Sequence, residues 1–336
     1  MPALLKSSQY FGFVATQISN LLLLFLIFTK ASTRFGSYKY LMISYAVYSL
    51  IYSWVEISAQ PIIYVGKASM YLYVDSFLKY NKAISTHLAA AYCASFGLCV
   101  SLLATHFVYR YCAVCRPHDL YRFDGWRLIR IYILPVVLSV LWYLEVYFLI
   151  GPSEIKNENA RAEIMEAYNE DIGKVGYIAL LYYYKDKSGN LVVSYIDFIA
   201  YTLALGIMGS CISTTMICGW KTFQKMGSIK KSMSKKTKEL NKQLFKTLVF
   251  QTLVPMFAMF APVGTLLTLP IFSIVISPIF SNAPSFYAGL YPALDAIIAI
   301  FMIRDFRDTV LCRPKLHVSI ASSIHSSHYN SSVLSG

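Results

Sequence analysis

Charged residues are scarce in this sequence. Asp, Glu, Lys and Arg make up 14% of its 336 residues, whereas an ordinary soluble domain contains about 25%. Hydrophobic residues account for 57% of the chain and aromatic residues for 15%. This composition excludes a typical soluble protein and predicts a chain that lies largely within a lipid bilayer.

Motifs for catalysis and for metal binding are also lacking. Cys112 and Cys115 have the spacing of half a zinc site, but no second pair or histidine cluster completes it. The sequence has no phosphate loop, no nucleophile motif and no internal repeat of the kind found in transporters. We therefore expect neither an enzyme nor a transporter, and we expect no metal and no cofactor.

The length of the chain accommodates seven membrane crossings, because each needs about 20 apolar residues to cross roughly 30 Å of hydrocarbon. The predicted fold is an all-α membrane protein, a seven-transmembrane helix bundle over residues 1–312. The serine-rich segment 313–336 is expected to be a disordered cytoplasmic tail. The spans are predicted near residues 10–28, 40–64, 87–111, 128–150, 195–220, 244–276 and 286–303.

Basic residues are concentrated on one side of this bundle. Of the 30 Lys and Arg residues, 21 follow spans one, three, five and seven. The positive-inside rule assigns these segments to the cytoplasm, so the N-terminus is expected outside and the C-terminus in the cytoplasm. The net charge of +13 then favours membrane orientation and contact with acidic lipid over binding to nucleic acid.

The outer side lacks cysteine, because all seven cysteines fall within predicted spans or on the cytoplasmic side. No disulfide is therefore expected to fasten the long outer loop at residues 151–194. Two interpretations of this loop remain open: a lid over the mouth of the bundle, or an ordinary solvated loop. On the cytoplasmic side, Cys312 is a candidate for palmitoylation and the tail serines are candidates for phosphorylation.

The third span is expected to form the axis of the bundle. It is rich in small residues, which let neighbouring backbones approach closely in a membrane. Arg110 lies where this helix should meet the cytoplasm, between Tyr109 and Tyr111, with Arg116 nearby. An arginine there can extend outward to water or turn inward to hold other helices. We interpret it as a cytoplasmic latch.

Acidic residues within spans are expensive in hydrocarbon and should face the bundle interior, a cavity or the interface. Glu56 and Glu145 lie in the outer halves of their spans, where aromatic residues would provide an apolar wall for a small ligand. Ordinary packing and interfacial aromatic belts are the competing explanation. The candidates for ligand binding are Glu56, Tyr92, Glu145, Tyr195, Phe260, Tyr287 and Tyr291.

Other residues point to a switch. Asn20 in span one and Asp295 in span seven should reach similar depth, so a polar contact between them is expected, with or without a role in switching. Span six contains Pro255 and two further prolines, which bend a helix and provide a hinge. A basic stripe on its cytoplasmic extension would bind a G protein or acidic lipid: Lys235, Lys238, Lys242 and Lys246.

Four blocks of the sequence resemble the nematode Str family of seven-transmembrane chemoreceptors. They fall in spans two, three, six and seven, in the order that the family shows. The blocks are FGSYKYLM at residues 35–42, AYCASF with HFVYRYCAVCRP within residues 91–117, KQLFKTLVFQTLVP at residues 242–255 and LYPALDAIIAIFMIRDFRDTV at residues 290–310.

This resemblance implies an odorant receptor in the membrane of sensory cilia that couples to a heterotrimeric G protein. By position, Tyr109, Arg110 and Tyr111 are similar to the arginine latch of rhodopsin-like receptors, and Pro292 with Asp295 is similar to their span-seven motif. Two departures are that no acid directly precedes Arg110 and that no loop cysteine can bridge to span three. A receptor dimer is compatible with the sequence.

The main hypothesis is therefore a receptor that binds a small molecule from outside and activates a G protein through movement of span six and the Arg110 region. The alternative is a ligand-gated cation channel of the insect odorant-receptor type, which also has seven spans but the opposite orientation.

Overall fold

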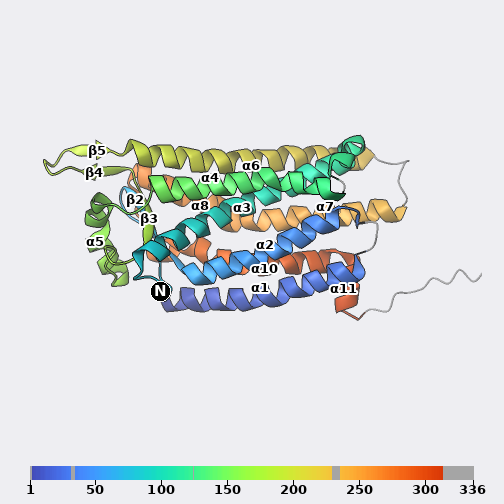
Figure 1. The fold of residues 1–336 in the computed structure, drawn as a ribbon, viewed down its shortest axis with the longest axis horizontal. Helices are drawn as coiled ribbons and strands as arrows, with labels where there is room; N and C mark the ends of the chain where they lie inside the picture. Colours follow the sequence, from blue (N-terminus) through green and yellow to red (C-terminus); the bar gives the residue numbers. More distant parts are fainter. Residues whose placement is uncertain (1, 32–34, 124, 229–234, 313–336) are drawn as a thin grey trace, which may run out of the picture.

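The structure is a computed structural model that describes residues 2–31, 35–123, 125–228 and 235–312. Seven helical segments in these ranges are long and apolar enough to cross a membrane, and they form one elongated bundle (Figure 1). The predicted seven-helix fold is confirmed. The main helices are α1 (Pro2–Lys30), α2 (Tyr38–Ala59), α3 (Lys82–Cys115), α4 (Ile133–Leu149), α6 (Tyr195–Ser228), α7 (Lys235–Pro255) and α10 (Ala283–Met302).

Helix α3 lies at the centre of the bundle, as its small residues predict. It packs against α4 and α6 along its length and against α2. Gly97 allows the ring of Trp142 to approach from α4, since a Cβ atom at residue 97 would lie 2.6 Å from Cε3 of that ring. Helices α1 and α10 are equally close, because a Cβ atom at Gly12 would lie 2.3 Å from the carbonyl oxygen of Gly289.

The sixth span is irregular where prolines interrupt its backbone hydrogen bonds. Helix α7 ends at Pro255, and a π-helical segment, η4 (Met256–Phe260), follows it directly. The span continues through α8 (Ala261–Thr268) and the 3₁₀ segment η5 (Leu269–Phe272), which contains Pro270. Because proline cannot donate the helical hydrogen bond, a local change in helix type at these positions is expected.

Short 3₁₀ segments connect α3 to α4. They are η2 (Pro117–Phe123) and η3 (Gly125–Tyr132). At the end of the chain that the structure describes, α9 (Pro278–Ser281) precedes α10, and α11 (Arg304–Val310) follows it.

A three-stranded antiparallel sheet covers one end of the bundle. Its strands are β1 (Pro61–Val65), β2 (Ser69–Val74) and β3 (Tyr177–Leu181), in the order β1–β2–β3. The first two form a hairpin between α2 and α3, and β3 comes from the long loop after α4. The same loop contributes α5 (Glu154–Tyr168) and a second hairpin, β4 (Tyr183–Lys185) with β5 (Leu191–Val193).

The sheet is buried on both faces, and its side chains alternate between two cores. Met70, Leu72 and Leu180 pack with the helices of the bundle. Tyr71 and Tyr177 point the other way and pack against α5. This two-residue alternation is the normal geometry of a strand, and here it inserts the sheet between the bundle and α5.

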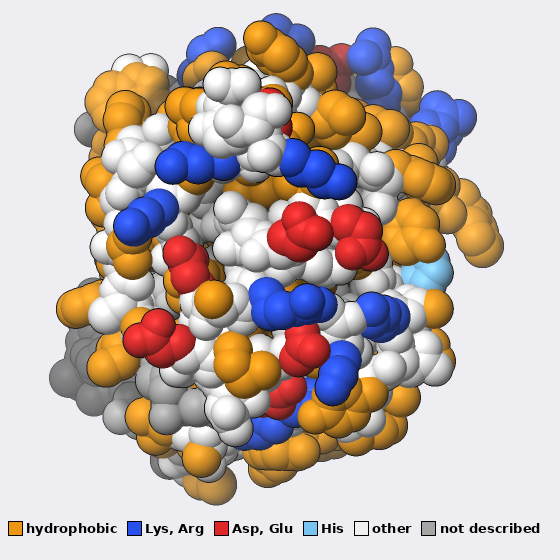
Figure 2. Space-filling model, turned by 90° about the vertical axis from the view of Figure 1, so that its left-hand side faces the viewer, with side chains coloured by type: hydrophobic (Ala, Val, Ile, Leu, Met, Phe, Trp, Pro, Cys, Tyr) orange, Lys and Arg blue, Asp and Glu red, His pale blue; other side chains and the backbone are white. Residues whose placement is uncertain are grey.

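Figure 1 shows α5 and the strands at one end of the bundle, with the start of α1 at the same end and α11 at the opposite end. Figure 2 looks onto the end with the strands, where acidic and basic side chains are mixed and hydrophobic side chains gather toward the edge. We call this the loop end, and the end with α11 the helix end.

Two predicted boundaries need comment. The predicted span 40–64 is too long, because α2 ends at Ala59, Gln60 adopts a left-handed conformation with φ of 46°, and Pro61 begins a strand. The predicted tail, residues 313–336, lies outside the described residues.

Candidate functional site

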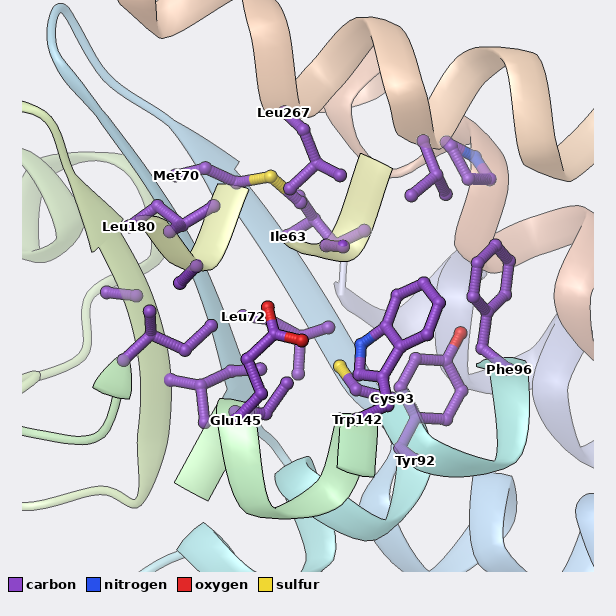
Figure 3. Close-up of a pocket in the computed structure, with 18 of the residues that line it drawn as sticks. Ile63, Met70, Leu72, Tyr92, Cys93, Phe96, Trp142, Glu145, Leu180 and Leu267 are labelled. Carbon is purple, nitrogen blue, oxygen red and sulfur yellow. The ribbon is translucent and has the colours of Figure 1, made fainter. Parts of the chain in front are cut away.

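A cavity lies beneath the sheet, at the loop end of the bundle (Figure 3). The strands form its cover through Ile63, Met70, Leu72, Ile178 and Leu180. The helices form its walls, with contributions from α3, α4, α6, α8 and α10 and from η4. The cover thus combines the β1–β2 hairpin with β3, so the loop that follows α4 forms part of a lid, which is one of the two interpretations open from the sequence.

The cavity is small and mostly apolar. Its volume is about 100 Å³, somewhat less than an engineered cavity of about 150 Å³ that binds benzene. Phe96 and Trp142 supply aromatic wall, and their rings meet edge to face at 6.0 Å. A space of this size and lining suits a molecule of a few heavy atoms with little polar surface.

Glu145 is the acidic residue of this cavity. Its carboxyl group points from α4 toward the strands, beside Leu72, while Tyr92 and Cys93 approach from α3 (Figure 3). Glu145 is 9% exposed, and no described residue makes a hydrogen bond or ion pair with its carboxyl group. An isolated buried acid is costly unless a partner satisfies it, so a ligand with one polar group would find a partner here.

The other predicted ligand residues occupy different places. Phe260 does not line the cavity but packs against Phe96, which does, with 5.5 Å between the ring centres. Tyr291 is buried deeper and hydrogen-bonds to Tyr45. Tyr195 and Tyr287 are 76% and 50% exposed, and neither lines this cavity.

Glu56 is also buried away from this cavity, against the backbone of α10. Gly289 provides the space for it, since a Cβ atom there would lie 2.9 Å from Oε1 of Glu56. This oxygen has no hydrogen-bond partner among the described residues.

The lid is fastened to the bundle by a buried ion pair. Lys156 of α5 places Nζ 3.0 Å from Oδ1 of Asp197, in the first turn of α6. The same ammonium group donates a hydrogen bond of 2.8 Å to the carbonyl oxygen of Ala179 in β3. Burial lowers the pKa of Lys156, and the neighbouring Asp197 carboxylate opposes that shift.

Asn20 and Asp295 both contact the interior, but not each other. Asn20 donates a hydrogen bond of 3.0 Å to the carbonyl oxygen of Pro292, about one helical turn before Asp295. Asp295 instead accepts a hydrogen bond of 2.8 Å from Gln251 of α7. The expected direct contact is therefore replaced by two separate links, one from α1 to α10 and one from α7 to α10.

Arg110 turns inward at the helix end of α3. Its guanidinium carbon lies 3.6 Å from the centre of the Tyr38 ring, at the start of α2. Its Nη1 donates a hydrogen bond of 3.3 Å to the side-chain oxygen of Asn241 in α7. One buried arginine thus joins three spans, as a stacked and hydrogen-bonded guanidinium group can.

Some residues around Arg110 face the interior of the bundle, and others lie nearer its surface. Tyr109 is buried and stacks on Tyr38 with 5.9 Å between ring centres. Tyr111 and Arg116 lie closer to the surface, with the guanidinium carbon 5.9 Å from the tyrosine ring. Pro255 immediately precedes the π-helical segment that contains Met259 and Phe260, so the helix is irregular where a hinge is predicted.

The lysines of α7 lie at the helix end. Lys238, Lys242 and Lys246 are exposed and line one groove. Lys235 begins the helix, but its side chain lies outside the described residues.

Sequence reasoning missed the strands, Tyr38 and Asn241. The hairpin had a signal, because PIIYV and SMYLYV are rich in β-branched and aromatic residues and flank Gly66. Tyr38 lay within a recognised block but had no assigned partner. Asn241 had no sequence signal that distinguished it from other polar residues of α7.

The structure is thus a seven-helix bundle with a covered cavity at one end and an inward-facing arginine at the other. The structure resembles the crystal structure of squid rhodopsin, with a TM-score of 0.58, 13% sequence identity, and coverage of 93% of this chain and 86% of that chain. This similarity shows the fold alone.

The profile of the family described as "Serpentine type 7TM GPCR chemoreceptor Str" matches residues 5–311, and the chain belongs to this family. Two relatives are serpentine receptor class r-10 of Caenorhabditis briggsae, 33% identical over 91% of this chain and 89% of the relative, and its namesake in Caenorhabditis elegans, 31% identical over 95% and 94%. The G-protein coupled receptor str-33 of C. elegans is 28% identical over 88% and 87%. The family is one of receptors, not of enzymes.

We expect the buried ion pair to be a main fastening of the lid. Lys156→Met should lower the stability of the receptor by about 3–5 kcal/mol, because it leaves the Asp197 carboxylate buried without its partner. The measurement is thermal unfolding of the purified receptor. The double variant K156M/D197L should recover most of the loss, since it removes both charges.

An exposed ion pair in the same loop is the control. Nε of Arg161 lies 3.4 Å from Oδ1 of Asp171, and the arginine side chain is largely exposed. Arg161→Met should therefore lower the stability of the receptor by less than about 1 kcal/mol. Equal losses from Lys156→Met and Arg161→Met would show that the buried pair does not fasten the lid.

Proposed function

We infer that this protein is a chemosensory receptor that binds a small, mostly apolar molecule in the cavity beneath the sheet and activates a heterotrimeric G protein at the helix end. The observation that carries this proposal is the position of α3. This helix supplies Tyr92, Cys93 and Phe96 to the cavity. It also presents Arg110, about 25 Å further along the helix, to α2 and α7.

The ligand follows from the cavity. A volume of about 100 Å³ with apolar walls favours an odorant-like molecule over a peptide or a sugar. Glu145 and the phenol of Tyr92 provide the polar groups that would orient it. Glu56, Tyr195, Tyr287 and Tyr291 do not line this cavity, so we assign them no direct contact in the described arrangement.

The switch follows from the links between spans. A ligand that binds one arrangement of the bundle better than another shifts their populations. Met259 belongs to the cavity wall and to the π-helical segment, so ligand contact acts directly on the irregular part of span six. Movement of α7 would then separate Asn241 from Arg110 and Gln251 from Asp295, which opens the helix end to a G protein.

The loop end is assigned to the outside and the helix end to the cytoplasm, since basic residues are concentrated in the segments at the helix end. Tyr111, Arg116 and the lysines of α7 would then face the G protein and acidic lipid. The plasma membrane of a sensory cilium is the proposed location. Family membership and the rhodopsin fold favour this receptor over a ligand-gated channel.

Epitope tags on the two chain ends test this orientation. In intact cells we expect antibody to reach the N-terminal tag but to reach the C-terminal tag only after permeabilisation. Staining of the C-terminal tag in intact cells would instead support the orientation of the insect channels.

Filling the cavity should abolish the response to ligand. Ala204 is buried in α6 and lines the cavity, so Ala204→Phe would occupy most of the available space. We expect the potency of an activating odorant to fall at least tenfold in a second-messenger assay with an odorant panel. The reason is that the cavity cannot hold the phenylalanine ring and the odorant at the same time. Surface labelling should show normal delivery to the membrane.

The control for this change is Leu203→Phe, at the adjacent position of α6, which is 47% exposed toward the lipid. It should respond as the natural receptor does. A normal response from Ala204→Phe would remove this cavity from the mechanism.

Arg110→Ala should reach the membrane but lose signalling to the same ligand. The alanine side chain cannot stack on Tyr38 or bind Asn241, so the link between α2, α3 and α7 is lost. Arg110→Lys should signal only partly, since an ammonium group lacks the planar fork of arginine. Arg130→Ala, at an exposed position of η3, is the control with unchanged signalling. Equal responses from Arg110→Ala and the natural receptor would contradict a role for Arg110.

A further inference from the structure

A second hollow lies at the helix end, on the side of the bundle between α6 and α7. It has a volume of about 650 Å³, far larger than the cavity beneath the sheet. Phe223 and Met226 line it from α6, and Phe245 and Phe250 line it from α7. We call it the α6–α7 groove.

Three lysines line this groove without an acidic partner. Lys238, Lys242 and Lys246 recur at four-residue spacing on one face of α7, so they share that face. None of the three makes an ion pair with a described residue. Residues 229–234 and 313–336, which lie outside the described residues, contain no Asp or Glu in their sequence.

The other polar residues of the same stretch are satisfied within the protein. Glu239 lies 3.8 Å from the guanidinium group of Arg304. Gln243 accepts a hydrogen bond of 3.3 Å from the backbone nitrogen of Arg304, and Asn241 binds Arg110. Among the α7 side chains that the structure describes, the lysines without an ion pair are therefore the three that line the groove.

Charge gives way to apolar surface along the groove. Lys238 and Lys246 lie about 12 Å apart along α7 at 1.5 Å per residue. Beyond them along α7, the Phe250 side chain is 48% exposed. On the facing helix, Phe223 is 64% exposed and lies near the end of α6, at the level of the lysines. Positive charge at the end of a span, followed by exposed aromatic surface at greater depth, is complementary to an anionic head group and its hydrocarbon chain.

We propose that the α6–α7 groove binds one acidic glycerophospholipid. Its head group lies against Lys238, Lys242 and Lys246, and an acyl chain lies along Phe223 and Phe250. This site is separate from the odorant cavity. It rests on the part of the proposed function that turns the lysines of α7 toward acidic lipid, but not on which ligand the receptor senses.

Native mass spectrometry of the full-length receptor tests this site. The receptor is purified from a mixture of phosphatidylcholine and phosphatidylserine with the same acyl chains, and retained lipids are counted after delipidation. The natural receptor should keep one phosphatidylserine. The variant K238Q/K242Q/K246Q should lose that adduct by more than tenfold, because each lysine near the membrane surface contributes to anion binding.

The matched control removes three basic residues at the same end of the bundle but outside the groove, at Lys30, Lys39 and Arg127, each replaced by Gln. It should keep the lipid. The double variant F223A/F250A keeps all charges and should also lose the adduct, because the acyl chain loses its wall. Unfolding temperatures in phosphatidylcholine alone establish that each variant is folded.

Three results would overturn the proposal. The first is equal loss of lipid from the groove variant and the control, which would indicate a general surface charge. The second is the absence of a retained acidic lipid on the natural receptor. The third is displacement of the adduct by soluble glycerophosphoserine or by phosphate on the tail serines, which would show that the groove binds an anion without its acyl chain.

Discussion

A polar group in hydrocarbon is strongly stabilised by a partner inside the protein, because no water is available to satisfy it. This constraint accounts for much of the arrangement described here. Arg110 is covered by the Tyr38 ring and bound by Asn241, and Asp295 is bound by Gln251. Each of these contacts joins different spans, so the need to satisfy a buried group also determines how the helices meet.

The same constraint explains what the sequence could predict. The seven spans follow from hydrophobicity, and the interior position of α3 follows from its small residues. The residues Tyr92 and Glu145 were predicted as ligand candidates, and both line the cavity. Depth along a helix follows from a count of residues, and this count predicted that Asn20 contacts span seven. Asn20 does contact α10, but its partner is the Pro292 carbonyl and not Asp295.

Contacts that depend on the fold of a loop could not be predicted in this way. The strand Pro61–Val65 was assigned to a span because its residues are as apolar as those of α2. Its pairing with β2, and that of β2 with β3 more than a hundred residues later, depends on tertiary structure. The partnership of Lys156 with Asp197 likewise depends on how α5 lies over α6, which no local pattern specifies.

The lid is held without a covalent bond. All seven cysteines are free, and β3 is fastened by backbone hydrogen bonds to β2 and by the ammonium group of Lys156. Folding of the loop end therefore needs no oxidant and no thiol exchange. A reducing medium that opens the loops of a cystine-linked receptor would leave this one closed over its cavity.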